Sequence, residues 1–329
     1  MSNISCASAD QASLYTSPYQ LVYASVQVVL FITTVVISIF AFIRLCKKSI
    51  IPDSTRILLI GSLLFANIHE IAYFICELRY VHMLFFHTDK SCYPLASTND
   101  CVPILTLIVM GITGNMLIQS ALSIDRLLAT VFPFAYSNLK VLPGSVLLTI
   151  VILLSASSFN IIRNGVVLDD YQLFCVNYSA RMSARANIYL EGCFYLTVIN
   201  IILNIILIIS NRNIEKKFRF DFKHHYLTSE TLKTTITICC LSIVQFLAMG
   251  LYSGGVLLMR KNRDNFLFTT YFNTIVWVYA PPYACVSLPI LILFSFWNLK
   301  KQRTAKIETI RSKTETQDEH MKKLRDSWA

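Results

Sequence analysis

The sequence predicts an all-α membrane protein, a seven-transmembrane helix bundle with its N-terminus outside the cell and its C-terminus in the cytoplasm. Three observations support this fold class. First, 55% of the 329 residues are hydrophobic and only 15% are charged, with a mean hydropathy of +0.55, whereas a soluble domain of this length carries more charge. Second, seven apolar stretches are each long enough to cross a bilayer. Third, Lys and Arg residues collect on one side of those stretches.

The apolar stretches are each about twenty residues long, enough as helix to span the roughly 30 Å of a hydrocarbon core. Inside a bilayer a helix satisfies all of its own backbone polar groups, so each stretch is predicted to be helical. Gly111, Gly114 and Asn115 interrupt the third stretch, and the fourth is the shortest. In chain order the predicted helices are Leu21–Ile43, Ile57–Leu78, Val102–Ile124, Gly144–Ile162, Asn187–Ile209, Thr234–Leu258 and Phe272–Phe296.

The distribution of Lys and Arg predicts the orientation. None precedes Leu21, whereas the segments after the first and fifth helices and after Phe296 are rich in both. Cytoplasmic loops carry such an excess, so 21 of the 29 Lys and Arg residues are assigned to the cytoplasm. Residues 1–20 then form an extracellular N-terminus, 21–296 the membrane domain and 297–329 a cytoplasmic tail. The net charge of +10 reflects this topology and suits a bilayer with anionic lipids, and it indicates no nucleic-acid partner.

Two Asn-x-Ser/Thr sequons agree with this orientation. Asn3 and Asn177 both fall in segments assigned to the outside, where glycosylation takes place. The first twenty residues lack the basic region of a cleavable signal peptide. The first helix is therefore expected to act as its own insertion signal.

The ten cysteines divide by compartment. Cys6, Cys92, Cys101 and Cys175 are assigned to the outside, where disulfides persist. Four cysteines allow three pairings, and on the residues alone all three stay open. A bridge between Cys101 and Cys175 would hold an external loop over the bundle. The other six cysteines are expected to act as small apolar side chains within or beneath the membrane.

Three carboxyl groups fall inside the predicted helices or near their ends. Ionised groups are costly in a bilayer and are usually functional there. Glu70 and Glu77 are seven residues apart and so share one helix face, and we interpret them as a polar seam for helix packing or ligand contact. Glu77 and Glu191 also fit the alternative of side chains that reach the outer membrane surface.

No enzyme class fits the sequence. An intramembrane zinc hydrolase needs several His or carboxylate ligands at one depth, and of the six histidines only His69 falls within a predicted helix. Gly-x-Ser-x-Gly, His-Glu-x-x-His and glycine-rich phosphate loops are missing from the chain. We therefore expect no catalytic residue, no metal and no cofactor.

Asp125 and Arg126 are adjacent charges at the end of the apolar third stretch. Seven helices, an external N-terminus, external cysteines and basic cytoplasmic loops describe a G protein-coupled receptor, and such receptors commonly hold an acid–Arg pair at this place. Arg126 follows Cys101 by 25 residues, roughly 37 Å of helix. The pair is predicted to end the third helix at the cytoplasmic face as an exposed switch for G-protein coupling, with further partners from the sixth helix.

Five stretches carry a resemblance to a known family: STRILLIGSLLFANIHEIAYF, SIDRLLAT, CLSIVQFLAMGLYSGGVLLMR, IVWVYAPPYA and TETQDEHMKKLRDSW. In this order they resemble the nematode serpentine receptors of class alpha (Sra), a family of chemoreceptors, nearly end to end. The family generally has Glu-Arg where this chain has Asp125–Arg126, and the charge pair is kept. The chain has Leu288–Pro289 where rhodopsin-like receptors carry the Asn-Pro of an Asn-Pro-x-x-Tyr motif, and Ile292 where they carry the Tyr.

The resemblance implies a multi-pass receptor in the plasma membrane at the ciliated endings of sensory neurons, which binds a small environmental molecule and activates a heterotrimeric G protein. It favours the disulfide Cys101–Cys175 and leaves Cys6 and Cys92 for a second bridge. The ligand is expected among the outer halves of helices three, five, six and seven. The candidate lining residues are polar or aromatic at suitable depth: Thr106, Glu191, Tyr195, Tyr252, Trp277 and Tyr279.

Two other classes of protein stay open. A ligand-gated channel like the insect odorant receptors also crosses the membrane seven times, but its N-terminus lies inside, so a glycan on Asn3 or Asn177 would exclude it. A small-molecule transporter is expected to have two similar halves with matched broken helices, which the sequence lacks, and it would show ion-dependent uptake.

The tail after Phe296 is polar and carries both charge signs. Ile307 and Ile310 are spaced for one helical face. We predict a short helix along the membrane surface, followed by a solvated end.

Overall fold

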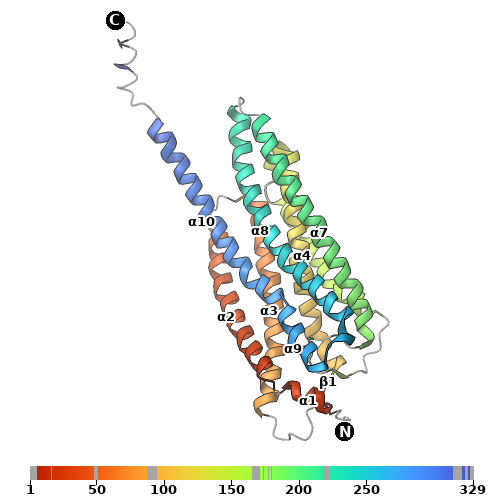
Figure 1. Ribbon diagram of the computed structural model, residues 1–329. Coiled ribbons are helices and arrows are strands. Elements are labelled where there is room, and N and C mark those ends of the chain that lie inside the picture. The colour runs from red at the N-terminus through yellow and green to blue at the C-terminus, as the bar shows by residue number, and fades with distance from the viewer. Residues whose placement is uncertain are drawn as a thin grey trace.

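The computed structural model describes residues 6–15, 17–47, 51–86, 95–164, 171–172, 174–176, 178, 180–217, 222–313, 321–322 and 325–326. Seven helical segments in these ranges are long and apolar enough to cross a membrane, which confirms the predicted all-α bundle (Figure 1). The first six are α2 (Pro18–Cys46), α3 (Asp53–Phe86), α4 (Thr98–Val131), α6 (Leu142–Arg163), α7 (Ala180–Lys217) and α8 (Phe222–Lys261). The seventh consists of α9 (Phe268–Val278) and α10 (Pro281–Lys313).

The first six helices follow the predicted order and extend beyond the apolar stretches. α6 is the shortest of the seven spans, with 22 residues, as predicted. Gly111 and Gly114 do not interrupt α4, which runs unbroken for 34 residues. The helices extend beyond the apolar stretches because a helix satisfies its own backbone hydrogen bonds in water as well as in lipid. Polar side chains alone therefore do not end a helix.

The seventh segment is broken, which corrects the single helix predicted over Phe272–Phe296. The chain leaves helical geometry at Tyr279 and Ala280, and α10 begins at Pro281, which Pro282 follows. Proline lacks the N–H that a helix interior requires but fits the first turn of a new helix. Two successive prolines therefore separate α9 from α10 and leave Tyr279 at the junction.

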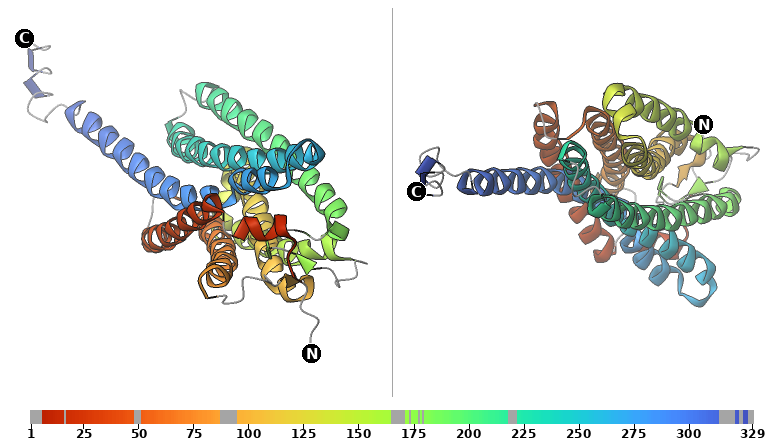
Figure 2. Two further views of the ribbon diagram at one scale, coloured as in Figure 1. Left: turned by 60° about the horizontal axis from the view of Figure 1, so that its bottom comes forward. Right: turned by 90° about the horizontal axis from the view of Figure 1, so that it is seen from above.

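α10 continues past Phe296 to Lys313 as one helix and leaves the bundle (Figures 1 and 2). This differs from the separate surface helix predicted for the tail. Residues 300–313 read KKQRTAKIETIRSK, which contains several good helix formers and neither Gly nor Pro. Nothing in this stretch ends the helix at the membrane boundary.

The short elements lie at the two ends of the bundle. α1 (Ala9–Tyr15) and β1 (Ala96–Ser97) lie at the end called the N-terminal end below (Figure 1). β1 pairs antiparallel with β2 (Tyr171–Gln172), so the segments before α4 and after α6 are joined there. α5 (Pro133–Leu139) follows α4 at the opposite end, and η1 (Arg263–Asn265) connects α8 to α9.

α3 and α4 are the central helices. They bury 61% and 56% of their apolar spans, whereas α2, α6 and α7 bury 22%, 28% and 28%. The outer helices instead expose large apolar side chains such as Val29, Ile150 and Ile199. Because lipid tails are themselves apolar, these exposed faces fit a bilayer. The structure is that of a multi-pass membrane protein.

α3 and α4 approach closely at Gly111, which gives the first prediction. A Cβ at this position would lie 2.6 Å from the His69 Cβ and 2.9 Å from the His69 backbone N. Gly111→Ala must therefore push α3 from α4, and overpacking of this kind costs about 1–3 kcal/mol. We expect a lower melting temperature for the purified detergent-solubilised protein, measured by size-exclusion chromatography after heating.

Gly192→Ala is the matched control, because an added Cβ there meets no heavy atom within 4 Å among the described residues. Alanine has the higher helix propensity by up to about 1 kcal/mol, so this variant should keep or raise the melting temperature. Equal losses in the two variants would show that close packing at Gly111 is not the cause.

Candidate functional site

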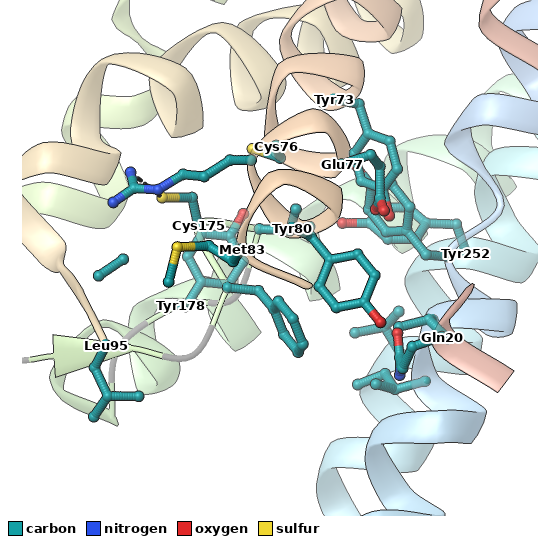
Figure 3. Close-up of a pocket in the computed structure, with 18 of the residues that line it drawn as sticks. Gln20, Tyr73, Cys76, Glu77, Tyr80, Met83, Leu95, Cys175, Tyr178 and Tyr252 are labelled. Carbon is teal, nitrogen blue, oxygen red and sulfur yellow. Dashed lines mark hydrogen bonds between the residues drawn. The ribbon is translucent and has the colours of Figure 1, made fainter. Parts of the chain in front are cut away.

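A cavity of about 170 Å³ lies near the N-terminal end of the bundle. It is bounded by α3, α8, the α9–α10 junction and the segment after β2 (Figure 3). The wall is mostly apolar and aromatic, with one acidic and two basic side chains. It consists of Gln20, Tyr73, Cys76, Glu77, Arg79, Tyr80, Met83, Leu95, Ala96, Phe174, Cys175, Val176, Tyr178, Tyr252, Val256, Arg260, Ile275, Val276 and Tyr279. An apolar wall with a few polar groups is the usual form of a small-molecule site.

One stripe of α3 supplies much of the wall. Tyr73, Cys76, Glu77, Tyr80 and Met83 all line the cavity, and their spacing of three or four residues places them on one face of the helix. Glu77 is only 9% exposed. Figure 3 shows Glu77, Tyr80 and Met83 among the side chains that line the cavity. The carboxylate therefore reaches the cavity from a helix that is itself central.

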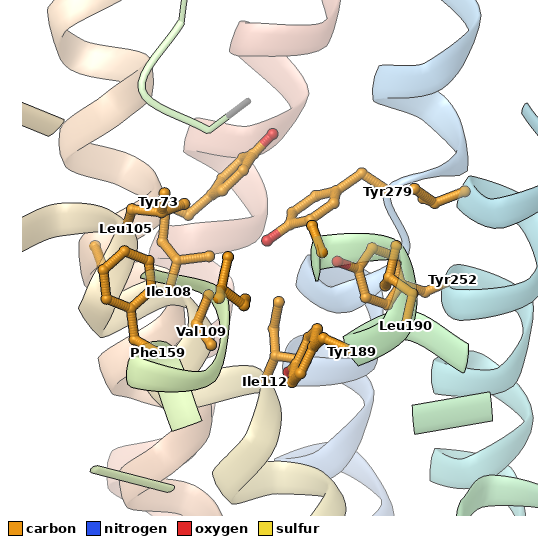
Figure 4. Close-up of a cluster of buried hydrophobic side chains, with 14 of the residues drawn as sticks. Tyr73, Leu105, Ile108, Val109, Ile112, Phe159, Tyr189, Leu190, Tyr252 and Tyr279 are labelled. Atoms are coloured by element: carbon orange, nitrogen blue, oxygen red, sulfur yellow. The ribbon is translucent and has the colours of Figure 1, made fainter. Parts of the chain in front are cut away.

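Tyrosines from four parts of the chain meet beside Glu77. The Tyr23 and Tyr73 hydroxyls lie 2.7 Å apart. The Tyr73 and Tyr279 rings stack with centroids 4.9 Å apart, and the Tyr252 ring meets Tyr279 edge-on at 5.3 Å. Figure 4 shows Tyr73, Tyr252 and Tyr279 above Ile112 of α4. Aromatic faces and hydroxyls together suit a ligand that is partly apolar and partly polar.

A disulfide joins the start of α4 to the cavity wall. Cys101 and Cys175 are bonded, with Cα atoms 5.0 Å apart, the pairing that the family resemblance favours. Phe174, Val176 and Tyr178 lie beside Cys175 and line the cavity. The bridge therefore holds this part of the wall against the bundle.

The two arginines of the wall already have protein partners. Arg79 Nη1 donates to Cys175 Sγ at 3.6 Å. Arg260 Nη1 donates to Asn187 Oδ1 at 3.0 Å, and its guanidinium lies 5.1 Å from the centroid of the Tyr178 ring. Burial raises the pKa of Tyr178 to about 12 although Arg260 opposes the shift, so the hydroxyl stays protonated at physiological pH. Among the described residues none forms an ion pair with Glu77, so this carboxyl group faces the cavity without a basic partner.

The second notable site is the pair Asp125–Arg126, near the end of α4 opposite the cavity. Both side chains are fully buried, and Arg126 Nη2 lies 2.6 Å from Asp125 Oδ2. Ser54 donates to Asp125 Oδ1 at 2.6 Å and Thr55 to Asp125 Oδ2 at 2.8 Å. Arg126 Nη2 also donates to the Thr55 hydroxyl. The pair is thus held by two hydroxyls from the first turn of α3.

Tyr136 of α5 closes the same network. Its hydroxyl donates to Asp125 Oδ1 at 2.8 Å and accepts from Arg126 Nη2 at 2.8 Å. Burial raises the pKa of Tyr136, so the hydroxyl remains a donor. Neighbouring helix residues point about 100° apart. The Arg126 guanidinium nevertheless lies beside Asp125, because it also donates hydrogen bonds to the Thr55 and Tyr136 hydroxyls. We call these five residues, Ser54, Thr55, Asp125, Arg126 and Tyr136, the charge lock.

The charge lock corrects the predicted position of the pair. Asp125 and Arg126 were expected to be exposed at the end of the third helix, with partners from the sixth. α4 instead continues to Val131, both side chains have no exposed surface, and the hydrogen bonds that the structure describes come from α3 and α5 rather than α8. Packing against the first turn of α3 buries them.

Residues 1–328 match the family described as the serpentine type 7TM GPCR chemoreceptor Sra. The chain belongs to this family. It is 60% identical over 325 residues to serpentine receptor class alpha-12 of Caenorhabditis briggsae, covering 99% of this chain and 100% of the relative. It is 60% identical over 324 residues to class alpha-12 of Caenorhabditis elegans, covering 98% and 99%, and 34% identical to class alpha-10 of Caenorhabditis elegans over 98% and 97%. It is therefore a serpentine chemoreceptor, a receptor rather than an enzyme.

The structure of this Sra receptor brings two of the six expected ligand-lining residues to the cavity, Tyr252 and Tyr279. The other four are not among the residues that line this cavity. Thr106 donates its hydroxyl to Val102 O of its own helix. Glu191 and Tyr195 are exposed on α7, because its buried face carries Tyr189, Leu190 and Cys193. Trp277 is 41% exposed and meets Tyr23 edge-on outside the cavity wall.

Several residues of the Sra receptor's two sites were missed by the sequence analysis. Tyr73, Tyr80 and Met83 continue the face that Glu77 marks, and their three- and four-residue spacing was the available signal. Ser54, Thr55 and Tyr136 had no such signal, because hydroxyls at helix ends are common. Glu70 and Glu77 do share a face of α3, as predicted, but only Glu77 lines the cavity.

Three predicted residues of the receptor lie outside the described residues: Asn3, Asn177 and Cys92. Cys6 is disulfide-bonded, and Cys92 is the partner that the sequence analysis left for it. Among the residues that the structure describes, the free cysteines are Cys46, Cys76, Cys193, Cys239, Cys240 and Cys285.

Proposed function

We propose that this Sra receptor is a G protein-coupled chemosensory receptor, which binds a small environmental molecule in the cavity and activates a heterotrimeric G protein through the charge lock. One observation carries the proposal. α4 is joined at its start to the cavity wall by Cys101–Cys175 and bears Asp125 and Arg126 near its other end. A ligand that shifts α4 therefore acts on both sites through one rigid element.

The cavity supports a small amphipathic amine as the ligand class. Glu77 is a buried carboxylate without an ion-pair partner in the part of the chain that the structure describes. A cation beside it would neutralise a charge that is costly in a membrane. The rings of Tyr73, Tyr252 and Tyr279 lie close by and would add cation–π attraction. The apolar part of the ligand would lie against Met83, Phe174 and Val256, which line the same cavity.

The proposed orientation has the N-terminal end, with the cavity, outside the cell and the charge lock at the cytoplasm. The excess of Lys and Arg in the predicted cytoplasmic segments supports it, and glycans on Asn3 and Asn177 are expected. The family supports a place in the plasma membrane of chemosensory neurons, at their cilia. Epitope tags at the two termini, labelled on intact cells, would test the orientation.

Glu77→Gln is the variant that tests the ligand class. The receptor is expressed with a heterotrimeric G protein carrying a resonance-energy-transfer pair, and subunit dissociation is recorded for a panel of small primary amines and their uncharged alcohol analogues. We expect amines to activate the receptor. Losing a charge-assisted hydrogen bond costs about 1.5–3 kcal/mol, so Glu77→Gln should raise the half-maximal amine concentration about 10- to 100-fold.

Glu191→Gln is the matched control, because Glu191 is exposed on α7 and its loss should leave amine potency unchanged. Equal responses to amines and alcohols in the unmodified receptor would exclude the amine class. The alternatives of a ligand-gated channel and a transporter predict an amine-evoked current or sodium-dependent uptake with no G-protein dissociation. Either result would overturn the proposed function.

A further inference from the structure

A second cluster of buried polar side chains lies deeper in the bundle, between α3, α4 and α10. His69 Nδ1 lies 3.4 Å from Glu70 Oε1 and 3.7 Å from Cys285 Sγ. Asn115 Nδ2 lies 3.7 Å from the same sulfur. His69, Glu70 and Cys285 are 0%, 2% and 1% exposed, and their ligating atoms all lie within 4.8 Å of one another. One imidazole, one carboxylate and one thiol thus converge away from water.

The spacing of these atoms matches a tetrahedral metal site. Zinc binds His nitrogen and carboxylate oxygen at about 2.0–2.2 Å and Cys sulfur at about 2.3 Å. Tetrahedral angles then separate nitrogen from oxygen by about 3.4 Å and nitrogen from sulfur by about 3.5 Å. The distances from His69 Nδ1 are 3.4 Å to Glu70 Oε1 and 3.7 Å to Cys285 Sγ. These two distances from His69 Nδ1 lie within a few tenths of an ångström of the tetrahedral values, and the three ligand atoms all lie within 4.8 Å of one another.

Asn115 offers the fourth ligand. Its side chain is only 5% exposed, and its Oδ1 has no hydrogen-bond partner in the described structure, an unfavourable state for a buried carbonyl. A half-turn of the amide exchanges its oxygen and nitrogen and brings Oδ1 to the side of Cys285 Sγ. Coordination of a metal would satisfy this oxygen.

Tyr279 supports the histidine from the other side of its ring. The Tyr279 hydroxyl lies 2.8 Å from His69 Nε2, so Nε2–H can donate to it while Nδ1 is left free for a metal. Metal-binding histidines are commonly oriented by such a partner. Tyr279 also lines the ligand cavity, which places the cluster one hydrogen bond away from it.

Charge balance selects the ion. A carboxylate and a thiolate carry two negative charges, so a divalent ion makes the site neutral, which a bilayer interior favours. Mg²⁺ and Ca²⁺ prefer oxygen ligands, so a site with nitrogen and sulfur ligands excludes them. A Cu⁺ ion would leave the site with a net charge of −1. Zn²⁺ binds the thiolate, so its binding displaces the proton of the Cys285 thiol.

We propose that His69, Glu70, Asn115 and Cys285 form an intramembrane Zn²⁺ site that clamps α3, α4 and α10 together beneath the ligand cavity. No metal was expected from the sequence, because only one histidine, His69, falls within a predicted helix. The fold supplies the sulfur and the amide from α10 and α4. The site does not depend on the proposed ligand or on G-protein coupling.

The test uses the full chain in lipid nanodiscs, stripped with a chelator and titrated with Co²⁺ as a spectroscopic substitute for Zn²⁺. We expect one Co²⁺ per chain, a thiolate-to-cobalt charge-transfer band in the near ultraviolet and visible bands typical of tetrahedral cobalt. Cys285→Ser should abolish the charge-transfer band. Cys193→Ser, which removes another buried free thiol, should keep it. Zn²⁺ should raise the melting temperature of the unmodified chain and leave that of Cys285→Ser unchanged.

Two results would overturn the site. One is the absence of a charge-transfer band in the unmodified chain, and the other is a band that persists in Cys285→Ser, because the exposed thiols of Cys46 or Cys240 would then be the ligands. Should Cys285→Ser fail to fold, X-ray absorption of the zinc-loaded unmodified chain decides. One sulfur at about 2.3 Å with nitrogen and oxygen at about 2.0–2.2 Å supports the site, and a shell of oxygen alone contradicts it.

Discussion

Arg126→Ala is expected to abolish G-protein activation, and Asp125→Asn is expected to raise signalling in the absence of ligand. Arg126 is held against Asp125 by hydroxyls of α3 and α5. Asp125→Asn keeps the size of the side chain but removes the charge that retains Arg126. Removing one partner of a buried ion pair costs about 3–5 kcal/mol, which is comparable with the few kcal/mol that separate receptor states. G-protein dissociation without ligand, at matched surface expression, measures both effects.

Tyr136→Phe and Arg212→Ala complete this experiment. Tyr136→Phe removes one hydroxyl that bonds to both charges, so a smaller rise in ligand-free signalling is expected. Arg212 is an exposed arginine of α7, and its loss should leave signalling unchanged. Normal activation by Arg126→Ala at matched surface expression would reduce the charge lock to a structural pair and remove it from the mechanism.

Cys101→Ser and Cys175→Ser are each expected to lower the melting temperature and to abolish the ligand response. The bridge joins residues 74 positions apart, for which loop-closure entropy gives a stabilisation of at most about 4.5 kcal/mol. The loss of ligand-binding free energy is expected to exceed the loss of folding free energy, since Phe174, Val176 and Tyr178 of the cavity wall lie beside Cys175. Thermal unfolding and agonist dose–response curves measure the two losses.

The double variant and a buried thiol provide the controls for the disulfide. Cys101→Ser combined with Cys175→Ser should lose no more than either single variant, because both substitutions remove the same bond. Cys193→Ser should behave as the unmodified receptor. Peptide mapping without reduction should link Cys101 to Cys175, and a link from Cys92 to Cys175 would contradict the assignment.

Much of the fold was predictable because the bilayer makes it a local property. A run of about twenty apolar residues suffices to specify a transmembrane helix whatever its neighbours are, so the order of the seven spans followed from the sequence. The charged pair Asp125–Arg126 could also be recognised from the sequence, because it follows a long apolar stretch. The break before Pro281 could have been predicted from its two prolines, but hydropathy continues across it and we predicted one helix.

The sites depended on tertiary structure. Ser54 lies 71 positions from Asp125, and Cys285 lies 216 positions from His69, and no pattern in the sequence pairs such residues. Periodicity shows which face of a helix is polar, but the rotation of that face toward a neighbour is set by packing, as where Gly111 lets α4 approach the backbone of His69. The sequence by itself therefore determined the helices, their order and the family. Only the packed bundle decided that Glu77 faces a cavity, that Glu191 faces outward and that the charge pair is buried, because burial belongs to the contact between helices.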